Sequence, residues 1–223
     1  QDKIKRSQYL TVLDDEVVDF NVDNYGISSV ILRSGGILNT RSLVVCAGTF
    51  LNGTIYIGND AYPAGRYGER PSLSLSQNIV NKGFNVSRLK TGTPPRLFGP
   101  SINWDNLISA VGDDAPVPFS IQTKLPFNPK NVPCYIVNTN TGVHDVLRDN
   151  LDKSSMYSGK IKSAGPRYCP SIEDKIVRFA DREKHQLFLE PEWNNAKQIY
   201  LNGFSTSMPR NIQEAALKKI SGL

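Results

Sequence analysis

The sequence of 223 residues is poor in the side chains that build metal sites, disulfide frameworks and membrane spans. It has two histidines and three cysteines, with no Cys-x-x-Cys pair and no HExxH motif, so we expect no metal site and no disulfide scaffold. An odd cysteine count of this kind indicates a reducing compartment. The longest apolar run, residues 43–51, is interrupted by Gly48 and Thr49. It falls far short of the ~20 residues that a transmembrane helix needs, and we expect no membrane segment.

The first ten residues, QDKIKRSQYL, contain neither the apolar core of a signal peptide nor an initiating Met. We therefore expect no secretory signal here, and a chain that is one piece of a longer protein. The composition, with 39% hydrophobic, 9% aromatic and 21% charged residues, is that of an ordinary globular protein. One large domain or two small domains would suit this length.

Positive charge is concentrated in one segment, residues 62–96. It contains six Lys or Arg residues and one acid, Glu69, so its net charge equals the +5 of the whole chain. Phosphate groups are the natural partners of such a segment, and a solvated basic face is the alternative.

The first part of the chain predicts a β-meander that leads into a buried strand. Turns at Tyr25-Gly26 and Ser34-Gly35-Gly36 separate strand-like runs at residues 9–14, 16–23 and 27–33. Residues 43–46 are apolar without alternation, which is typical of a strand covered on both faces, so we expect Cys46 in the core. Gly48, just after this run, would let a backbone or a ligand approach closely.

The rest of the chain predicts alternating helices and strands. A helix at 72–81 stops near Gly83, and a strand then leads to TGTPPR, whose two prolines place a domain boundary near residue 98. Ser171 followed by Asp174 predicts the start of a helix. The other predicted elements are strands at 132–137, 186–192 and 197–203 and a helix at 209–220.

Cys169 is the candidate catalytic residue, because it stands two residues after Arg167 and just before the helix expected at Ser171. A helix N-terminus and a cationic side chain both lower the pKa of a thiol. A nucleophilic thiolate and a small buried hydrophobe are both open readings of this cysteine. Cys134 has no electropositive surroundings, and His144 is either an acid or base or a structural residue.

Six stretches together resemble the MnmG/GidA family, flavoproteins that modify the wobble uridine of certain transfer RNAs. They are VVCAGTFLNG, YPAGRYGERPS, RLKTGTPPR, NLDKSSMYSG, GPRYCPSIEDK and FADREKHQLFLEPE. The resemblance covers about residues 9–220. It implies an α/β fold in which a glutathione-reductase-like FAD-binding domain, here partial and at 1–98, is interrupted by a second, inserted α/β domain, here incomplete and at 99–223.

The resemblance also implies cofactor-binding residues. Val17 and Ser72 match positions that contact FAD, and Gly48 closes a strand that passes near the dinucleotide. The G-x-G-x-x-G loop of the family is absent from this sequence, so we expect this piece to bind FAD poorly and to be inactive alone. The basic segment 62–96 would face FAD or transfer-RNA phosphates, and we favour Arg66 and Lys90 as its anion ligands.

In the family, the segment matching 165–179 binds a nicotinamide dinucleotide, and its cysteine is one of two thiols needed for the reaction. This assigns Cys169 to catalysis and a further set of residues to the dinucleotide: Gly165, Pro166, Arg167, Tyr168 and Ser171. The resemblance implies that FAD, reduced by NADH, works with a one-carbon unit from methylenetetrahydrofolate. The product is an aminomethyl-type group at carbon 5 of the uridine, of the carboxymethylaminomethyl or taurinomethyl type. Whether Cys169 attacks the ring or acts as acid or base stays open.

The partners implied by the resemblance are tRNA, a GTPase of the MnmE type and a second copy in a homodimer. The excess of basic over acidic residues and the Asn-rich loops favour the mitochondrial matrix, and a bacterial cytoplasm is the alternative. Two other functions stay open. One is a folate- and FAD-dependent tRNA uridine methyltransferase that acts on a different uridine, and the other is a piece that only binds RNA or a partner.

Overall fold

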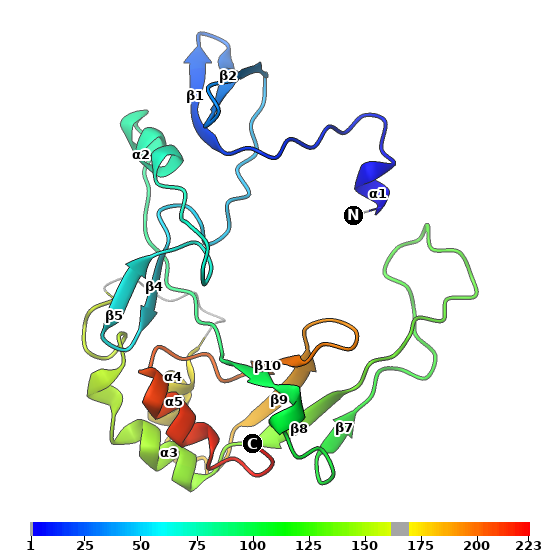
Figure 1. Ribbon diagram of the computed structural model, residues 1–223, viewed down its shortest axis with the longest axis vertical. Coiled ribbons are helices and arrows are strands. Elements are labelled where there is room, and N and C mark those ends of the chain that lie inside the picture. Colours follow the sequence, from blue (N-terminus) through cyan, green and yellow to red (C-terminus); the bar gives the residue numbers. More distant parts are fainter. Residues whose placement is uncertain (1, 162–169) are drawn as a thin grey trace. The chain divides into compact units, whose positions relative to one another are not determined.

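The computed structural model describes residues 2–161 and 170–223, which form two compact units (Figure 1). Unit 1 comprises residues 1–55 and 61–87, and unit 2 comprises residues 56–60 and 88–223. Residues 56–60 of unit 2 lie within a short hairpin that is formed by β4 (Thr54–Ile57) and β5 (Asp60–Pro63). Among the described residues, no helix combines the length and the hydropathy needed to cross a bilayer.

Unit 1 is built on an antiparallel meander of three strands. These are β1 (Val17–Asp23), β2 (Gly26–Leu32) and β3 (Ile37–Asn39), which follow the short helix α1 (Asp2–Lys5). Helix α2 (Ser74–Asn81) packs on β1, and Phe20, Val30 and Leu75 form the buried core. The predicted helix is thus confirmed. It ends as expected at Gly83, because Gly83 N donates to Val80 O and Phe84 N donates to Ile79 O.

Two predicted strands of unit 1 are wrong. Residues 9–14 and 43–46 have no strand structure, and β3, which the pattern did not predict, is the third strand of the meander. Val44 is 82% exposed and Cys46 is also exposed, so the prediction that Cys46 lies in the core is wrong as well. The physical reason is that a strand needs a neighbour to accept its backbone hydrogen bonds, and no described residue pairs with 43–46.

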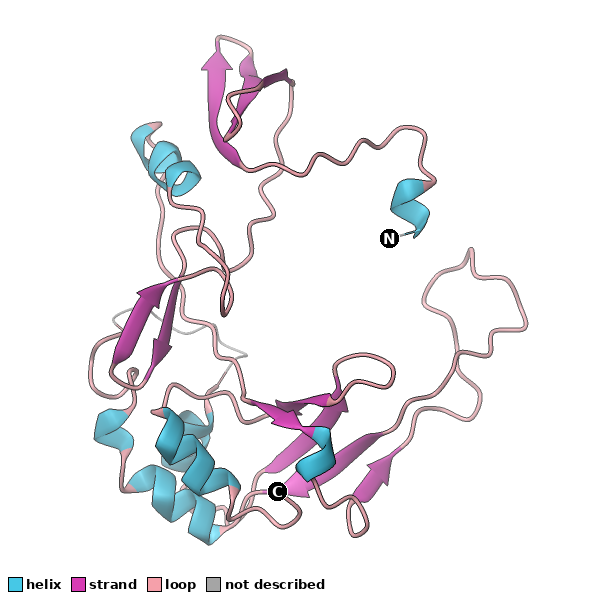
Figure 2. Cartoon of the chain, viewed as in Figure 1, coloured by secondary structure: helices cyan, strands magenta, loops and turns pink. Residues whose placement is uncertain are grey.

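Unit 2 is a five-stranded antiparallel sheet with helices grouped beside it (Figure 2). The strand order is β6 (Arg96–Phe98), β10 (Gln198–Asn202), β9 (Gln186–Pro191), β8 (Cys134–Asn138) and β7 (Ile108–Ala110). The helices are α3 (Thr141–Arg148), α4 (Ile172–Arg178) and α5 (Arg210–Leu217), with 3-10 turns η1 (Gly99–Ser101) and η2 (Leu151–Lys153). Inward residues of the sheet, such as Leu187, Leu189 and Leu201, share one buried cluster with residues of all three helices.

The predicted strands at 132–137, 186–192 and 197–203 are confirmed as β8, β9 and β10, and the helices at 171 and 209–220 as α4 and α5. The strand predicted before TGTPPR is wrong, because residues 84–92 have no regular structure. A mixed α/β fold is confirmed. The glutathione-reductase-like arrangement, the inserted domain and the boundary near 98 stay predictions. The two compact units divide between residues 87 and 88. Residues 88–98 thus belong to unit 2, in which β6 pairs with β10.

Candidate functional site

The first turn of α4 is fixed by a buried capping box, as its sequence predicts. Ser171 is the N-cap, and its hydroxyl oxygen accepts a hydrogen bond from Asp174 N at 3.1 Å. In return, Asp174 Oδ2 accepts from Ser171 N at 3.0 Å. Both residues are buried. The backbone that follows residue 170 is therefore held in one conformation by two reciprocal hydrogen bonds.

Glu173, in the same helical turn, is a completely buried carboxylate that ties three segments together. Its Oε1 accepts hydrogen bonds from Ser154 Oγ at 3.2 Å, from Thr206 Oγ1 at 2.9 Å and from Ser207 N at 2.9 Å. Its Oε2 has no hydrogen-bond partner among the described residues. We call Ser154, Ser171, Glu173, Asp174, Thr206 and Ser207 the polar cluster. Its only carboxylates lie on the first turn of α4, and the other residues donate to them.

Tyr157 borders the polar cluster and donates from its hydroxyl to Asp174 Oδ1 at 3.3 Å. Burial, followed by the negative charge of Asp174, raises the pKa of Tyr157 to about 12. Because this is far above neutral pH, the phenol keeps its proton and remains a hydrogen-bond donor.

Sequence reasoning missed Glu173, Ser154 and Tyr157. An acid in the first turn of a helix is ordinarily a solvated side chain that stabilises the helix dipole, and nothing in the local pattern indicates that Glu173 is buried. The donors come from segments about 19 and 33 residues away, at Ser154 and Thr206. Only the tertiary fold brings them to the carboxylate.

Lys90 lies in the same unit and is almost completely buried, at 8% exposure. Its Nζ has no hydrogen-bond acceptor among the described residues. The segment around it runs beside the polar cluster, because Thr206 N donates to Thr93 O at 3.3 Å. That Lys90 binds an anion stays a prediction. It agrees with a buried ammonium group that has no acceptor among the described residues.

Most residues that we predict to act in catalysis or to bind the nicotinamide dinucleotide lie outside the described residues. They are Gly165, Pro166, Arg167, Tyr168 and Cys169. Ser171 is the one residue of this set that the structure describes.

The three positions that the resemblance assigns to FAD lie together in unit 1. Ser72 Oγ donates to Glu16 Oε1 at 3.1 Å, and Glu16 precedes Val17 at the start of β1. Ser72 N donates at 2.9 Å to Phe50 O, two residues after Gly48. Gly48 has a φ of +52°, and no atom lies within 4 Å of the place where a Cβ would stand. The arrangement fits a ligand that approaches open backbone beside a hydroxyl group.

Glu16 is a further residue of this group that the sequence did not indicate. Its Oε2 lies 2.7 Å from Arg33 Nε, and this hydrogen bond holds the pKa of Glu16 below its usual value. The carboxylate is therefore ionised at neutral pH and accepts from both Arg33 and Ser72.

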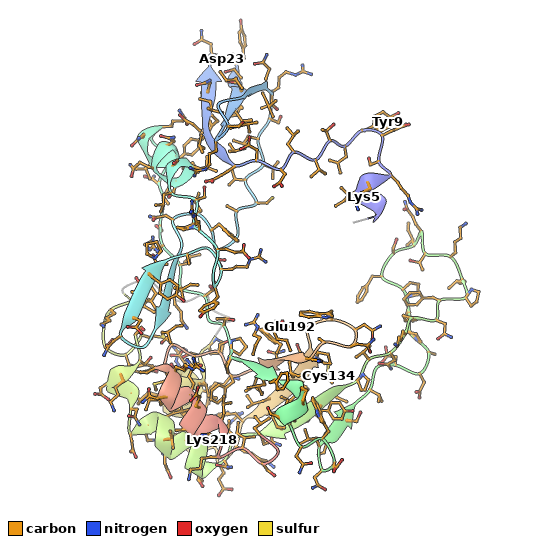
Figure 3. All side chains as sticks on the ribbon, viewed as in Figure 1. Lys5, Tyr9, Asp23, Cys134, Glu192 and Lys218 are labelled. Carbon is orange, nitrogen blue, oxygen red and sulfur yellow. The ribbon has the colours of Figure 1, made fainter. Side chains whose placement is uncertain are left out.

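Three of the other basic side chains of segment 62–96 differ from Lys90 in having acidic partners. Arg66 is exposed and pairs with Glu69 at 2.9 Å, with its guanidinium 5.4 Å from the centre of the Phe50 ring. Arg96 Nε lies 2.8 Å from Oε1 of Glu192, which Figure 3 labels. Lys82 pairs with Asp19. These pairs offset part of the positive charge that the sequence shows, and the anion-binding role of Arg66 stays a prediction.

The two histidines form a buried pair in unit 2. His144 Nε2 and Thr139 Oγ1 share a hydrogen bond at 2.7 Å, and the His144 and His185 ring centres are 5.2 Å apart. Burial is the main cause that lowers the pKa of each imidazole. These buried contacts favour a structural role for His144 over a role as an acid or base. Burial, together with Glu190, raises the pKa of Cys134, in agreement with the absence of an activated thiol there.

Metal binding receives no support from the part of the chain that the structure describes, which contains no group of three His, Cys, Asp or Glu side chains placed to hold an ion.

Comparisons with known proteins identify the relatives of this chain. The family described as glucose inhibited division protein A matches residues 1–223. The tRNA uridine 5-carboxymethylaminomethyl modification enzyme MnmG of Thermodesulfovibrio yellowstonii is 45% identical over 220 residues, which are 99% of this chain and 35% of that protein. The protein of the same name from Chlorobaculum tepidum is 42% identical over 221 residues, which are 99% of this chain and 36% of that protein.

The fold is also that of a solved relative. The structure of Aquifex aeolicus GidA in its form I crystal matches with a TM-score of 0.89 and 42% identity. The match covers 100% of this chain and 38% of that chain. The chain thus spans little more than a third of the length of the relatives that it matches.

Proposed function

Because the chain belongs to the glucose inhibited division protein A family, we propose that it is the central part of an enzyme that modifies tRNA. The relatives are named as tRNA uridine 5-carboxymethylaminomethyl modification enzymes. We assign the same reaction, at carbon 5 of the wobble uridine, to the whole protein of which this chain forms a part.

The polar cluster is the observation that carries this proposal. A buried glutamate with three donors on one oxygen, next to a capping box, is a costly arrangement that ordinary packing does not require. It fixes the backbone at Ser171, two residues after Cys169 in the sequence. A reactive thiol needs a defined position relative to its substrate, and a rigid supporting shell gives one.

Cys169 is the proposed catalytic residue. A thiolate that adds to a pyrimidine ring makes carbon 5 nucleophilic, and an acid or base role for the same thiol is the alternative. Tyr157 keeps its proton at neutral pH and holds Asp174 in the capping box. Its part in this proposal is to orient the start of α4.

FAD is the proposed redox cofactor, and Val17, Gly48 and Ser72 are the residues of this chain that would contact it. The open backbone at Gly48 and the Ser72 hydroxyl support this assignment. When bound, a flavin supplies two-electron redox chemistry. NADH as reductant and methylenetetrahydrofolate as one-carbon donor complete the proposed set. The dinucleotide would bind at residues 165–168 and Ser171.

The proposed partners are tRNA, an MnmE-type GTPase and a second copy of the protein in a homodimer. We propose the mitochondrial matrix as the compartment, which would admit a taurinomethyl product in place of the carboxymethylaminomethyl group. These assignments come from the resemblance and from the basic balance of the sequence.

Substitution of Cys169 by Ser in the full-length protein tests the reaction. We expect the modified wobble uridine to fall by about a hundredfold or more, measured by mass spectrometry of nucleosides from tRNA. Cys46→Ser is the matched control, because Cys46 is an exposed thiol to which no role is assigned. It should leave the modification unchanged.

Normal wobble-uridine modification in the Cys169→Ser protein would eliminate the thiol role. A product mapped to a different uridine would instead support the tRNA methyltransferase. A full-length protein that binds tRNA without altering any uridine would support a binding function alone.

A further inference from the structure

Lys90 is the one lysine that is buried among the described residues. Its side chain is 8% exposed, and its ammonium group has no acceptor among the described residues. Lys175, which is partly buried in the same unit, donates from Nζ to Gly203 O at 2.9 Å. Both side chains lose most of their contact with water, but only Lys175 has a protein acceptor in exchange.

An ammonium group buried without an acceptor destabilises a fold, because it gives up its hydration and receives no hydrogen bond or opposite charge. Buried polar groups are therefore almost always paired, and an unpaired one requires an explanation. Glu173, the completely buried acid of the same unit, does not provide one. Glu173 Oε1 binds Ser154, Thr206 and Ser207, and no ion pair joins Glu173 to Lys90 among the described residues.

Gly92 lets its backbone lie close to both Lys90 and Ser205. A Cβ placed on Gly92 would stand 3.5 Å from Lys90 Nζ, 3.5 Å from Ser205 Oγ and 2.9 Å from Ser205 Cβ. The ammonium and the hydroxyl therefore both lie beside Gly92, at the place where a side chain on this residue would stand. Both groups can donate hydrogen bonds, which is the combination that binds an oxyanion.

The backbone that carries these groups is held in place. Thr206 N donates to Thr93 O at 3.3 Å, and Ile172 N donates to Ser205 O at 2.7 Å. Gly92 and Ser205 are the direct neighbours of the paired threonines. The donors are thus fixed on two segments that the polar cluster also anchors, and Ser205 itself is partly accessible to solvent.

We propose that Lys90 and Ser205 form a binding site for a phosphate-type oxyanion. The source of the phosphate rests on the proposed function, which supplies a dinucleotide cofactor and tRNA. The depth of Lys90 favours the pyrophosphate of a dinucleotide, because phosphates of an RNA backbone are met by side chains on the surface.

Thermal unfolding of the chain with and without inorganic pyrophosphate tests the site. Both tryptophans, Trp104 and Trp193, belong to unit 2, so their fluorescence follows the unit that contains Lys90. We expect pyrophosphate to raise the Tm of the wild-type chain, as any ligand specific for the folded state does. Lys90→Met keeps the apolar stem and removes the charge. It should raise the Tm of the ligand-free chain and weaken pyrophosphate binding by about tenfold or more.

Two further variants make the result specific. Lys160→Met is the control, because Lys160 is exposed and lies outside the segments to which a cofactor is assigned. It should lower the Tm slightly, because Asn59 O loses its donor, and it should leave the response to pyrophosphate intact. Ser205→Ala should weaken pyrophosphate binding by several fold with little change in the Tm of the ligand-free chain.

The proposal is overturned if the wild-type chain does not respond to pyrophosphate. It is also overturned if Lys90→Met lowers the Tm and responds to pyrophosphate as strongly as Lys160→Met does. Titrations with ADP and with a tRNA anticodon stem-loop separate the two sources. A Lys90-dependent response to ADP supports the dinucleotide, and one to the stem-loop alone assigns the oxyanion to RNA. None of these measurements needs uridine modification, so they stand apart from the Cys169→Ser test.

Discussion

The two units of the chain differ in how completely they bury their apolar residues. In unit 2 one cluster of 15 buried apolar side chains joins the sheet to its helices, whereas the core of unit 1 has three. Unit 1 exposes apolar side chains at Tyr9, Val12, Val44 and Val45, and unit 2 exposes them in the segment before β8, at Val117, Phe119 and Ile121. Apolar content alone therefore does not determine burial. A segment is buried only where the described chain also supplies the elements that cover it.

Truncation of one core phenylalanine in each unit should show this difference most strongly. Phe204→Ala in unit 2 should cost about 4 kcal/mol, because the side chain is completely buried among many neighbours that cannot close the cavity. Phe20→Ala in unit 1 should cost about half as much, because a core of three residues can relax. Denaturant titration followed by tryptophan fluorescence measures the first loss, and hydrogen exchange of the β1 and β2 amides measures the second. Equal losses would contradict the comparison.

In unit 2 the sequence predicted β8, β9, β10, α4 and α5, because these elements carry their own signals, but it did not predict β6, β7 or α3. β9 and β10 alternate apolar and polar residues, and α4 begins with Ser171 and Asp174 in capping positions. These signals are local, and the neighbours that each strand needs are present in the same unit. The antiparallel order β6-β10-β9-β8-β7 was not predictable, because strand order depends on contacts between distant segments.

In unit 1 the same reasoning failed at residues 43–46, where an apolar run without a neighbouring strand is not a strand. For the candidate site, the sequence indicated Ser171 and Lys90 but not Glu173. A capping residue and a basic segment are visible as patterns, whereas a carboxylate that is buried by donors from Ser154 and Thr206 is a property of the tertiary fold.

Removal of the buried carboxylate should have the next largest effect. Glu173→Ala leaves Ser154, Thr206 and Ser207 without their acceptor and should destabilise unit 2 by about 3 kcal/mol, as chemical denaturation would measure. Glu173→Gln retains one acceptor oxygen and should cost about 1 kcal/mol.

Glu16→Ala is the matched change in unit 1. Glu16 is half-exposed and contacts Arg33 and Ser72, so its loss should cost less than about 1 kcal/mol. If Glu16→Ala proved as damaging as Glu173→Ala, the burial of the polar cluster would not be what makes it important for stability.

Mild acid should produce the smallest effect, and only in unit 2, because both histidines of the chain lie there. Burial lowers the pKa of His144 and His185, with further lowering by Arg148 at the first and by His144, Lys175 and Arg182 at the second. In mildly acidic solution the folded unit therefore binds fewer protons than the unfolded chain. The stability that the neutral histidines contribute is fully present above their unfolded pKa of about 6.5. It is lost as the pH falls through their lowered pKa values in the folded unit.

We expect the Tm followed by tryptophan fluorescence to fall by roughly a few degrees between pH 7.5 and pH 5.5. The protection factors of the β1 and β2 amides, which correct for the intrinsic pH dependence of exchange, should change little. His144→Gln can still bond to Thr139 but cannot take up a proton, so it should remove about half of the pH dependence. An unchanged slope in His144→Gln would mean that other groups cause the acid sensitivity. In that case the hydrogen bond between His144 and Thr139 would stabilise unit 2 without making its stability depend on pH.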